Sequence, residues 1–392
     1  MKEGWKYKKL GEVCDIIGGG TPSKKNTAYY EGNIPWATVR DMNCNVLSKT
    51  EFKISEEGFN DSASHIIKKG EIIIATRVGL GKVCKLAQDT AINQDLKGII
   101  PKKYDIIRDF IFYFFKSRAK FIEENGVGAT VKGVKIKFVE DLLFPIIPLK
   151  EQQRIVSRLD AAFSHIDKLK ANAEKQLSEA RALFQKSLAK AMEPKEGWEV
   201  KTLKEVCSVI TDGTHHSPTN LPTGKYKYIT AKNIKPWGLD LSNITYVSED
   251  VHREIVARCN PQKGDVLYIK DGATTGIAII NPLDEEISIL SSVALIRPQK
   301  SILLSKYLCY ALNSPSIYEQ TRNQMDGAAI TRVTLVKIKG FSIPLPSLSE
   351  QQRIVERLDA LSAHVRELEE NQKKIISECD ALKQALLRKV FE

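Results

Sequence analysis

Two long segments, residues 150–193 and 349–392, contain no glycine and carry apolar or small residues at alternating steps of four and three. In the first segment the stripe is Ile155, Leu159, Ala162, Ile166, Leu169, Ala173, Gln176, Ala180 and Leu183. In the second it is Ile354, Leu358, Leu361, Val365, Leu368, Gln372, Ile375, Cys379 and Leu382. Such spacing, held for four heptads, is typical of a coiled-coil seam. It predicts two helices, each about 65 Å long, that pair antiparallel within one chain.

The segments that precede these helices have a different pattern. Short apolar runs bounded by Gly, Pro and Asn predict strands at residues 71–76, 266–270 and 287–297. Helical patterns cover residues 105–124 and 301–323, and Pro315 is expected to interrupt the second. Pro-containing stretches end both segments and act as boundaries. Ser349 is expected to cap the second long helix, whereas Lys150 is a poor cap for the first.

The sequence contains an internal repeat. Lys-Glu-Gly-Trp at residues 2–5 recurs at 195–198, and Lys-Gly-Glu-Ile at 69–72 recurs as Lys-Gly-Asp-Val at 263–266. The ten residues 151–160 return at 350–359 with a single change, Ser157 to Glu356. Between these anchors the halves differ widely. A repeat of this kind predicts one structural unit used twice, with variable middles between similar ends.

These patterns together predict an α+β protein with an internal pseudo-two-fold repeat. We expect a globular domain at residues 1–148, a long helix at 149–193, a second domain at 194–348 and a second long helix at 349–392. Two globular domains are then joined by two long helices that form an intramolecular antiparallel coiled coil.

Charge separates the domains from the helices. The whole chain has a net charge of +11. The excess of Lys and Arg over Asp and Glu residues is +7 and +3 in the two domains, but +2 and −1 in the two helices. An excess of positive charge favours a polyanionic partner. Basic domains on near-neutral helices predict two contacts with nucleic acid, whose affinity depends strongly on salt.

Candidate DNA contacts are polar and basic residues in turns and near β-type runs, and three of them, Arg40, Arg77 and Lys82, lie at the ends of such runs beside Gly, Asp or Asn. Arginine can pair with guanine and asparagine with adenine. The glycine-rich turn at residues 18–25 is also expected to form a phosphate-binding nest of amides. In the first domain the candidates are Thr21, Ser23, Lys24, Lys25, Arg40, Arg77 and Lys82. In the second domain, where Asp-Gly-Thr-His at residues 212–215 occupies a comparable place, they are Thr214, His215, His216, Lys227, Lys232, Asn233, Lys270, Thr274 and Thr275.

Several kinds of chemistry lack their motifs. There is no P-loop, no Asn/Asp-Pro-Pro-aromatic loop of an amino-methyltransferase and no Pro-Asp pair of the common nuclease motif. The seven cysteines are scattered, and the paired histidines have no further ligands at metal-binding spacing, so neither disulfides nor a metal site are expected. Apolar runs are too short to cross a membrane and the N-terminus has no signal region, which predicts a cytoplasmic protein.

In this combination the chain resembles the specificity subunit of type I restriction–modification systems. The resemblance covers essentially the whole sequence. It is carried by Gly-Gly-Thr-Pro-Ser at residues 19–23, by Asp-Gly-Thr-His at 212–215, and above all by Pro-x₅-Glu-Gln-Gln-Arg-Ile-Val at 145–156 and 344–355.

The resemblance implies a non-catalytic subunit that binds double-stranded DNA. Each variable domain is then a target-recognition domain for one half of an interrupted site, and the helices set the unread spacer. Two methyltransferase subunits, which hold S-adenosylmethionine, methylate adenine N6, and restriction subunits that use ATP and Mg²⁺ cut the DNA. No cofactor is expected on this chain. The duplicated helix starts become candidates for partner docking or for contact with the domains: Glu151, Gln152, Gln153, Arg154, Glu350, Gln351, Gln352 and Arg353.

Two alternatives remain open from the residues alone. One is a stand-alone nuclease with a dispersed catalytic site, and the other is a two-headed DNA-binding regulator without enzymatic partners. The missing catalytic loops disfavour the first, and the duplicated helix starts, which suggest two identical docking sites, disfavour the second.

Overall fold

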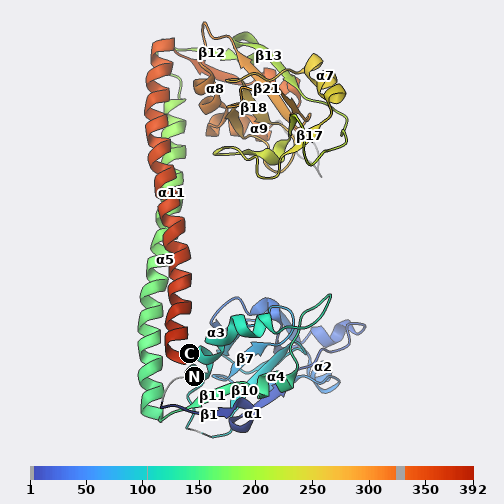
Figure 1. Ribbon diagram of the computed structural model, residues 1–392, viewed down its shortest axis with the longest axis vertical. Coiled ribbons are helices and arrows are strands. Elements are labelled where there is room, and N and C mark those ends of the chain that lie inside the picture. Colours follow the sequence, from blue (N-terminus) through green and yellow to red (C-terminus); the bar gives the residue numbers. More distant parts are fainter. Residues whose placement is uncertain (1–3, 104, 324–331) are drawn as a thin grey trace. The chain divides into compact units, whose positions relative to one another are not determined.

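The computed structural model of the protein describes residues 4–103, 105–323 and 332–392, so Lys2 and Glu3 of the repeated Lys-Glu-Gly-Trp lie outside the described residues. The chain divides into two compact units. The first comprises Met1–Ala173 and Lys373–Glu392, and the second comprises Glu174–Gln372. Each unit therefore contains one globular domain and a segment of each long helix, α5 (Leu149–Ala191) and α11 (Leu348–Phe391) (Figure 1).

The first domain contains two main sheets, in which most neighbouring strands are antiparallel. A five-stranded sheet has the order β2-β10-β7-β8-β4, a four-stranded sheet has the order β5-β3-β9-β6, and β1 pairs with β11. The strands are β1 (Lys6–Lys9), β2 (Cys14–Gly18), β3 (Ile34–Ala37), β4 (Val46–Leu47), β5 (Phe52–Ile54), β6 (His65–Ile67), β7 (Ile72–Ala75), β8 (Val83–Leu86), β9 (Thr90–Ile92), β10 (Leu96–Pro101) and β11 (Leu143–Ile146). The helices are α1 (Leu10–Val13), α2 (Glu56–Asn60), α3 (Arg108–Glu124) and α4 (Ile136–Glu140), and α3 packs on β7 and β8.

The second domain repeats this plan. A four-stranded sheet has the order β13-β21-β18-β19, a three-stranded sheet has the order β17-β14-β20, and β12 pairs with β22, as β15 does with β16. The strands are β12 (Glu199–Thr202), β13 (Cys207–Asp212), β14 (Tyr226–Ile229), β15 (Ile234–Lys235), β16 (Gly238–Leu239), β17 (Thr245–Val247), β18 (Val266–Ile269), β19 (Ala278–Ile280), β20 (Ile287–Ile289), β21 (Val293–Pro298) and β22 (Ser342–Leu345). The helices are α6 (Leu203–Val206), α7 (Glu249–Arg258), α8 (Ser305–Leu312), α9 (Pro315–Asn323) and α10 (Leu335–Lys339). The predicted α+β class with a duplicated unit is confirmed.

Local predictions hold in part. Pro315 does interrupt the helical pattern, because α8 ends at Leu312 and α9 starts at Pro315. The prediction of a single strand at 287–297 is wrong, because residues 290–292 separate two strands, β20 and β21. Ser349 is not the cap either: α11 begins at Leu348, and the Ser347 hydroxyl accepts from the Glu350 amide at 3.4 Å.

In both units the α5 and α11 segments run antiparallel. In the first unit Asp167 pairs with Lys383, and the Lys170 ammonium lies 2.7 Å from Asp380. In the second unit the Arg181 guanidinium lies 2.7 Å from Glu369. As residue numbers rise along α5, those of the partners fall along α11, which is the pairing that the heptads predicted.

The predicted seam is right at most of its positions and displaced by one residue at Leu169, Gln176, Leu183, Ile375 and Leu382. Ile166, Ala173 and Ala180 are buried as expected. Leu169 and Leu183 are each 57% exposed, while Lys170, Leu177 and Phe184 lie on the inner side. The same shift occurs on α11, where Ile375 and Leu382 are exposed and Lys383 is largely covered. The steps of four and three are kept, but lysine stems occupy seam positions.

One polar pair lies in the seam of the second unit. The buried Gln372 amide nitrogen donates to the Gln176 side-chain oxygen at 3.0 Å, and Gln176 itself is exposed. A polar residue at such a position specifies register while lowering stability. Gln372→Leu is therefore expected to raise the free energy of unfolding of the second unit by about 1 kcal/mol, because the freed Gln176 amide can bond water.

The reciprocal variant Gln176→Leu should have the opposite sign. It leaves the buried Gln372 amide without its partner, at a cost of about 1 kcal/mol. Thermal unfolding with amide hydrogen exchange of the second unit's peptides measures both changes. Equal signs for the two variants would contradict this role of the pair.

Each hydrophobic core includes the distal end of a long helix. In the first unit, Leu387 and Phe391 of α11 are buried among Phe110, Phe114 and Phe144. The Phe391 ring lies 5.3 Å from that of Phe110 and 6.1 Å from that of Phe114, centroid to centroid. In the second unit, Leu188 of α5 and Met192 just beyond it are buried with Tyr307, Leu308 and Phe341. Each domain is thus completed by the helix that belongs to the other repeat.

Candidate nucleic-acid interface

The loops that follow β2 and β13 occupy equivalent places in their domains. The Gly20 amide donates to the Ile92 carbonyl at 3.0 Å, and the Thr214 amide donates to the Ile289 carbonyl at the same distance. Ile92 and Ile289 end the equivalent strands β9 and β20. The equivalence of the two motifs expected from sequence is confirmed.

The glycine before each of these amides is required by close packing. A Cβ atom at Gly19 would lie 2.1 Å from the Ile92 carbonyl oxygen, and one at Gly213 would lie 1.8 Å from that of Ile289. Any side chain would therefore push the loop off the neighbouring strand. The glycines hold the polar residues that follow them against the ends of β9 and β20.

The glycine-rich turn of the first domain does not offer all its amides to a ligand. Besides the Gly20 amide, the Gly20 carbonyl is in use, since it accepts from Trp36 Nε1 at 3.1 Å and from the Ser64 hydroxyl at 2.9 Å. The expected phosphate-binding nest thus lacks this amide. Ser23, Lys24 and Lys25 extend into solvent, and the half-buried Thr21 hydroxyl donates to Gln94.

The other candidates of the first domain gather around the turn between β7 and β8. Arg77 and Lys82 flank the β7–β8 turn, and a Cβ at Gly79 in that turn would lie 2.9 Å from Val39, next to Arg40. Lys82 Nζ donates to the Asn43 side chain at 2.7 Å. Arg40 and Arg77 are held loosely, at 3.8 Å from Glu51 and 3.7 Å from Asp95, and both remain exposed. The structure brings these three cations together.

Three predicted contacts of the second domain have structural roles instead. Asn233 is buried: its side-chain oxygen accepts from the Thr230 amide at 3.0 Å, and its nitrogen donates to the Asp240 carbonyl at 3.2 Å. The buried Thr275 hydroxyl donates to the Gly272 carbonyl at 2.7 Å. Lys270 is 3% exposed and lies among carboxylates. All three side chains are therefore buried and engaged within the protein.

The remaining candidates of the second domain are accessible to different degrees. Lys227 is half-buried and lies 2.6 Å from Glu285. His215, His216, Lys232 and Thr274 are exposed, and Thr214 is intermediate. The Thr214 hydroxyl accepts from the His216 amide at 3.2 Å, which shapes the turn that presents both histidines.

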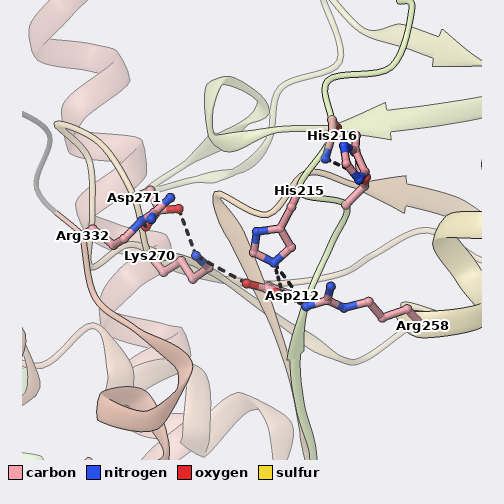
Figure 2. Close-up of polar contacts among 8 residues, drawn as sticks. Asp212, His215, His216, Arg258, Lys270, Asp271 and Arg332 are labelled. Carbon is pink, nitrogen blue, oxygen red and sulfur yellow. Dashed lines mark hydrogen bonds and ion pairs between the residues drawn. The ribbon is translucent and has the colours of Figure 1, made fainter.

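Figure 2 shows a charged network around this turn that joins the buried Asp212 and the largely covered Asp271 to three cations and His215. Asp212, at the end of β13, lies 2.7 Å from the Arg258 guanidinium and 3.4 Å from Lys270 Nζ. Lys270 Nζ also lies 2.9 Å from Asp271, which in turn lies 3.2 Å from Arg332. His215 Nε2 lies 3.3 Å from Asp212 and 3.2 Å from Arg258.

Sequence reasoning missed four members of this network: Asp212 as an ion-pair partner, Arg258, Asp271 and Arg332. Arg258 and Arg332 come from the end of α7 and from a segment that bridges to Asp271. Only the tertiary fold brings them to the turn. The one local signal was Asp212, which directly precedes the Gly-Thr-His motif.

The duplicated helix starts anchor each domain to its helix. The buried Gln152 side chain bonds the Ile107 amide at 2.9 Å and the carbonyls of Asp105 and Ile147 at 2.8 and 3.0 Å. The buried Gln351 makes the same set with the Leu304 amide and the carbonyls of Ile302 and Pro346. Partner docking is therefore corrected to internal anchoring for these two residues.

A second duplicated contact supports the anchor. The Tyr113 hydroxyl donates to Asp160 at 2.5 Å, and the Tyr310 hydroxyl donates to Asp359 at 2.8 Å. Burial, with the neighbouring carboxylate, raises the pKa of both phenols, which keeps them protonated donors. Gln153, Arg154, Gln352 and Arg353 are exposed, and Glu151 and Glu350 are half-buried, so these six stay candidates for docking.

Among residues 4–103, 105–323 and 332–392, no group of three or more His, Cys, Asp or Glu is placed to hold a metal ion. No helix in these ranges is long and apolar enough to cross a membrane.

Comparison with known proteins gives a consistent picture. The family described as type I restriction modification DNA specificity domain matches residues 2–179 and 195–378, once for each repeat. The chain is 24% identical to the MjaIX specificity subunit of Methanocaldococcus jannaschii, over 98% of this chain and 92% of that protein. It is 23% identical to the EcoBI specificity subunit of Escherichia coli, over 100% and 86%.

Solved structures share the fold. A chain from a type I restriction–modification system matches with a TM-score of 0.79 at 22% identity, covering 100% of this chain and 98% of that one. The HsdS subunit from Thermoanaerobacter tengcongensis matches with a TM-score of 0.56 at 22% identity, covering 100% and 97%. Since the family profile spans both repeats, the chain belongs to the family of DNA specificity subunits of type I restriction–modification systems, as its sequence motifs predicted.

Proposed function

We propose that this chain reads a two-part, interrupted DNA site, one half with each domain, and directs adenine-N6 methylation and restriction by partner subunits. The observation that carries the proposal is that the two domains share one backbone arrangement but have different side chains at equivalent positions. The Val134 amide bonds the Thr76 carbonyl, and the Val333 amide bonds the Lys270 carbonyl, both at 2.9 Å, which makes Thr76 and Lys270 equivalent. The neighbouring pairs Arg77–Asp271 and Gly133–Arg332 also differ. Different donors on one frame suit two different half-sites.

The accessible donors supply the contacts. We assign phosphate or base contacts to the candidates that stay at least partly exposed: Thr21, Ser23, Lys24, Lys25, Arg40, Arg77, Lys82, Thr214, His215, His216, Lys227, Lys232 and Thr274. The positive balance of the domains supports this assignment, because phosphate contacts dominate affinity for DNA.

The chemistry belongs to partners. We propose that two methyltransferase subunits per chain dock at the exposed residues of the duplicated helix starts, carrying S-adenosylmethionine, and that restriction subunits bring ATP and Mg²⁺. The duplication of these surfaces at the start of α5 and α11 supports a stoichiometry of one to two. Such an assembly works on the DNA of the cytoplasm.

Genome-wide mapping of N6-methyladenine in the source cell tests the two-part site. An interrupted motif is expected. A contiguous motif contradicts reading by two domains, and methylation or cleavage of DNA by the purified chain alone favours a stand-alone enzyme. A chain that binds DNA but co-purifies with no methyltransferase favours a two-headed regulator.

Exchange of residues 1–148 for the matching domain of a relative is expected to change one half of the methylated motif and leave the other half and the spacer intact. The reason is that the cores of the two domains share no residue and that each domain has a separate polar surface. Mapping of N6-methyladenine reads both halves at once. A change in both halves would contradict independent reading.

We propose that α5 and α11 set the spacer. Inserting four residues into one helix adds about 6 Å but breaks the paired heptads. Seven residues added to both helices beside Gln176 and Gln372 keep the register and add about 10 Å, or about three base pairs. The expected result is a spacer about three base pairs longer with unchanged half-sites; changed half-sites at constant spacing contradict the assignment.

A further inference from the structure

The charged network of the second domain presents two arginines that nothing above assigns a function. We propose that Arg258 and Arg332 are specificity-determining contacts with DNA bases in the half-site of this domain, held in place by Asp212 and Asp271. The inference rests on the proposed function and deepens it. Asp212 and Asp271 act on DNA only through the arginines, so they are positioning residues.

The Arg258 side chain is more than half exposed, and one of its terminal nitrogens is held by neighbouring side chains. Its side chain is 54% exposed, whereas Asp212, 2.7 Å from it, is 3% exposed. His215 Nε2, 3.2 Å away, accepts from the same guanidinium nitrogen when that ring nitrogen is unprotonated. Both neighbours contact the same terminal nitrogen, Nη2, beside the His215–His216 turn (Figure 2). A guanidinium held in place in this way is pre-organised to donate its remaining N–H groups to a base edge.

Arg332 is arranged in the same way on the other side of the network. Its side chain is 60% exposed, and its Nε lies 3.2 Å from Asp271, which is 11% exposed. The backbone is fixed as well, because Arg332 forms a β-bridge with Asp271 and the next amide, that of Val333, donates to the Lys270 carbonyl at 2.9 Å.

Lys270 joins the two halves of the network. Its side chain is 4% exposed, and its ammonium lies 3.4 Å from Asp212 and 2.9 Å from Asp271. The carboxylates that would repel DNA are thus buried and neutralised, while the surplus positive charge is carried by the two exposed guanidinium groups. Burial of the negative partners distinguishes this network from an ordinary surface ion pair, in which both charges are solvated.

The first domain carries an arginine at the same bridge. Arg77 pairs with Gly133 there, as Asp271 pairs with Arg332 in the second domain. Arg77 is 53% exposed and has a carboxylate partner, Asp95, that is 16% exposed. Both domains therefore present one exposed arginine with a covered carboxylate at this point, but from opposite strands of the bridge. A shifted guanidinium on the same frame fits two domains that read different bases.

The test is selection from a pool of random 40-base-pair duplexes by the full-length chain, with any partner that co-purifies, followed by sequencing. Arg258→Lys and Arg332→Lys keep the charge and remove the fork. Each is expected to lower discrimination at one or two positions of a single half-site by roughly 5- to 150-fold. The other half-site should be unchanged. Arg258→Gln and Arg332→Gln should add a loss of overall affinity.

Arg253→Lys is the matched control, since Arg253 lies on the same helix α7, is 73% exposed and pairs with Glu249 at 2.5 Å. It should select the wild-type motif. The inference is overturned if the Arg258 and Arg332 variants select the unaltered motif, or if they lose affinity equally for all duplexes. In either case the two-part site of the wild type stands. If the wild-type chain itself selects no two-part motif, the proposed function fails first. Because both arginines are more than half exposed, thermal unfolding of the lysine variants should match the wild type.

Discussion

Replacing Phe391 with alanine is expected to lower the free energy of unfolding of the first unit by about 3–5 kcal/mol. Phe391 is 1% exposed and packs against Phe110 and Phe114, so its removal leaves a cavity among rigid aromatic rings. The second unit should keep its stability, because its core is closed by Leu188 and Met192 instead. Amide hydrogen exchange, followed peptide by peptide, separates the two units.

Leu382→Ala is the control for this variant. Leu382 lies on the same helix but is 48% exposed, and its truncation should change the stability by no more than about 0.5 kcal/mol. Faster exchange in the peptides of residues 105–124 is expected for Phe391→Ala alone. Equal loss of protection in both units, or none in the first, would contradict the view that α11 completes the first core.

The second large effect is expected from Gly213→Ala. The added Cβ would lie 1.8 Å from the Ile289 carbonyl oxygen, which is backbone and cannot swing away. Overpacking of this kind costs about 3 kcal/mol, and the loop that carries Asp212 and His215 must move off β20. We therefore expect both a lower thermal stability of the second unit and loss of selectivity for its half-site, measured by selection from random duplexes.

Two further glycine variants test whether the effect of Gly213→Ala arises from close packing at this position. Gly340→Ala is the control in the same unit, since the nearest atom to its Cβ would be 3.4 Å away, at ordinary contact distance. Gly19→Ala is the counterpart in the first domain, where the Ile92 carbonyl oxygen would lie at 2.1 Å. It should abolish reading of the other half-site only. If Gly213→Ala and Gly340→Ala behave alike, close packing is not the reason for this glycine.

The long helices could be predicted because their signal is local and periodic, yet several seam positions were placed one residue off. Leu169 looks like the core residue and Lys170 like the surface residue. In the fold, Lys170 is 29% exposed with its ammonium on Asp380, and Leu169 is 57% exposed. A lysine stem covers apolar surface while its charge finds a partner across the helix pair, and that partner is 210 residues away.

The contact residues could be predicted only where a loop motif carries them. Thr214, His215 and His216 follow a glycine that packing demands, so sequence located their turn. In the sequence, Asn233 and Thr275 look the same as contact residues. In the structure, the side chain of each donates a hydrogen bond to a nearby backbone carbonyl. Arg258 is 46 residues from Asp212 in the chain, and no local pattern links them.

The closing of each core by a distant helix end has a consequence during protein synthesis. The domain made first, which ends near α5, lacks Leu387 and Phe391 until almost the whole chain has left the ribosome. Its exposed aromatic surface around Phe110 and Phe114 must wait through the making of some 240 further residues, roughly 10–50 s at 5–20 residues per second. The second domain does not wait, because α5 is already present when its strands emerge. The first-made half of this protein is therefore the last to be finished, and a nascent chain stalled before α11 would be a natural substrate for chaperones.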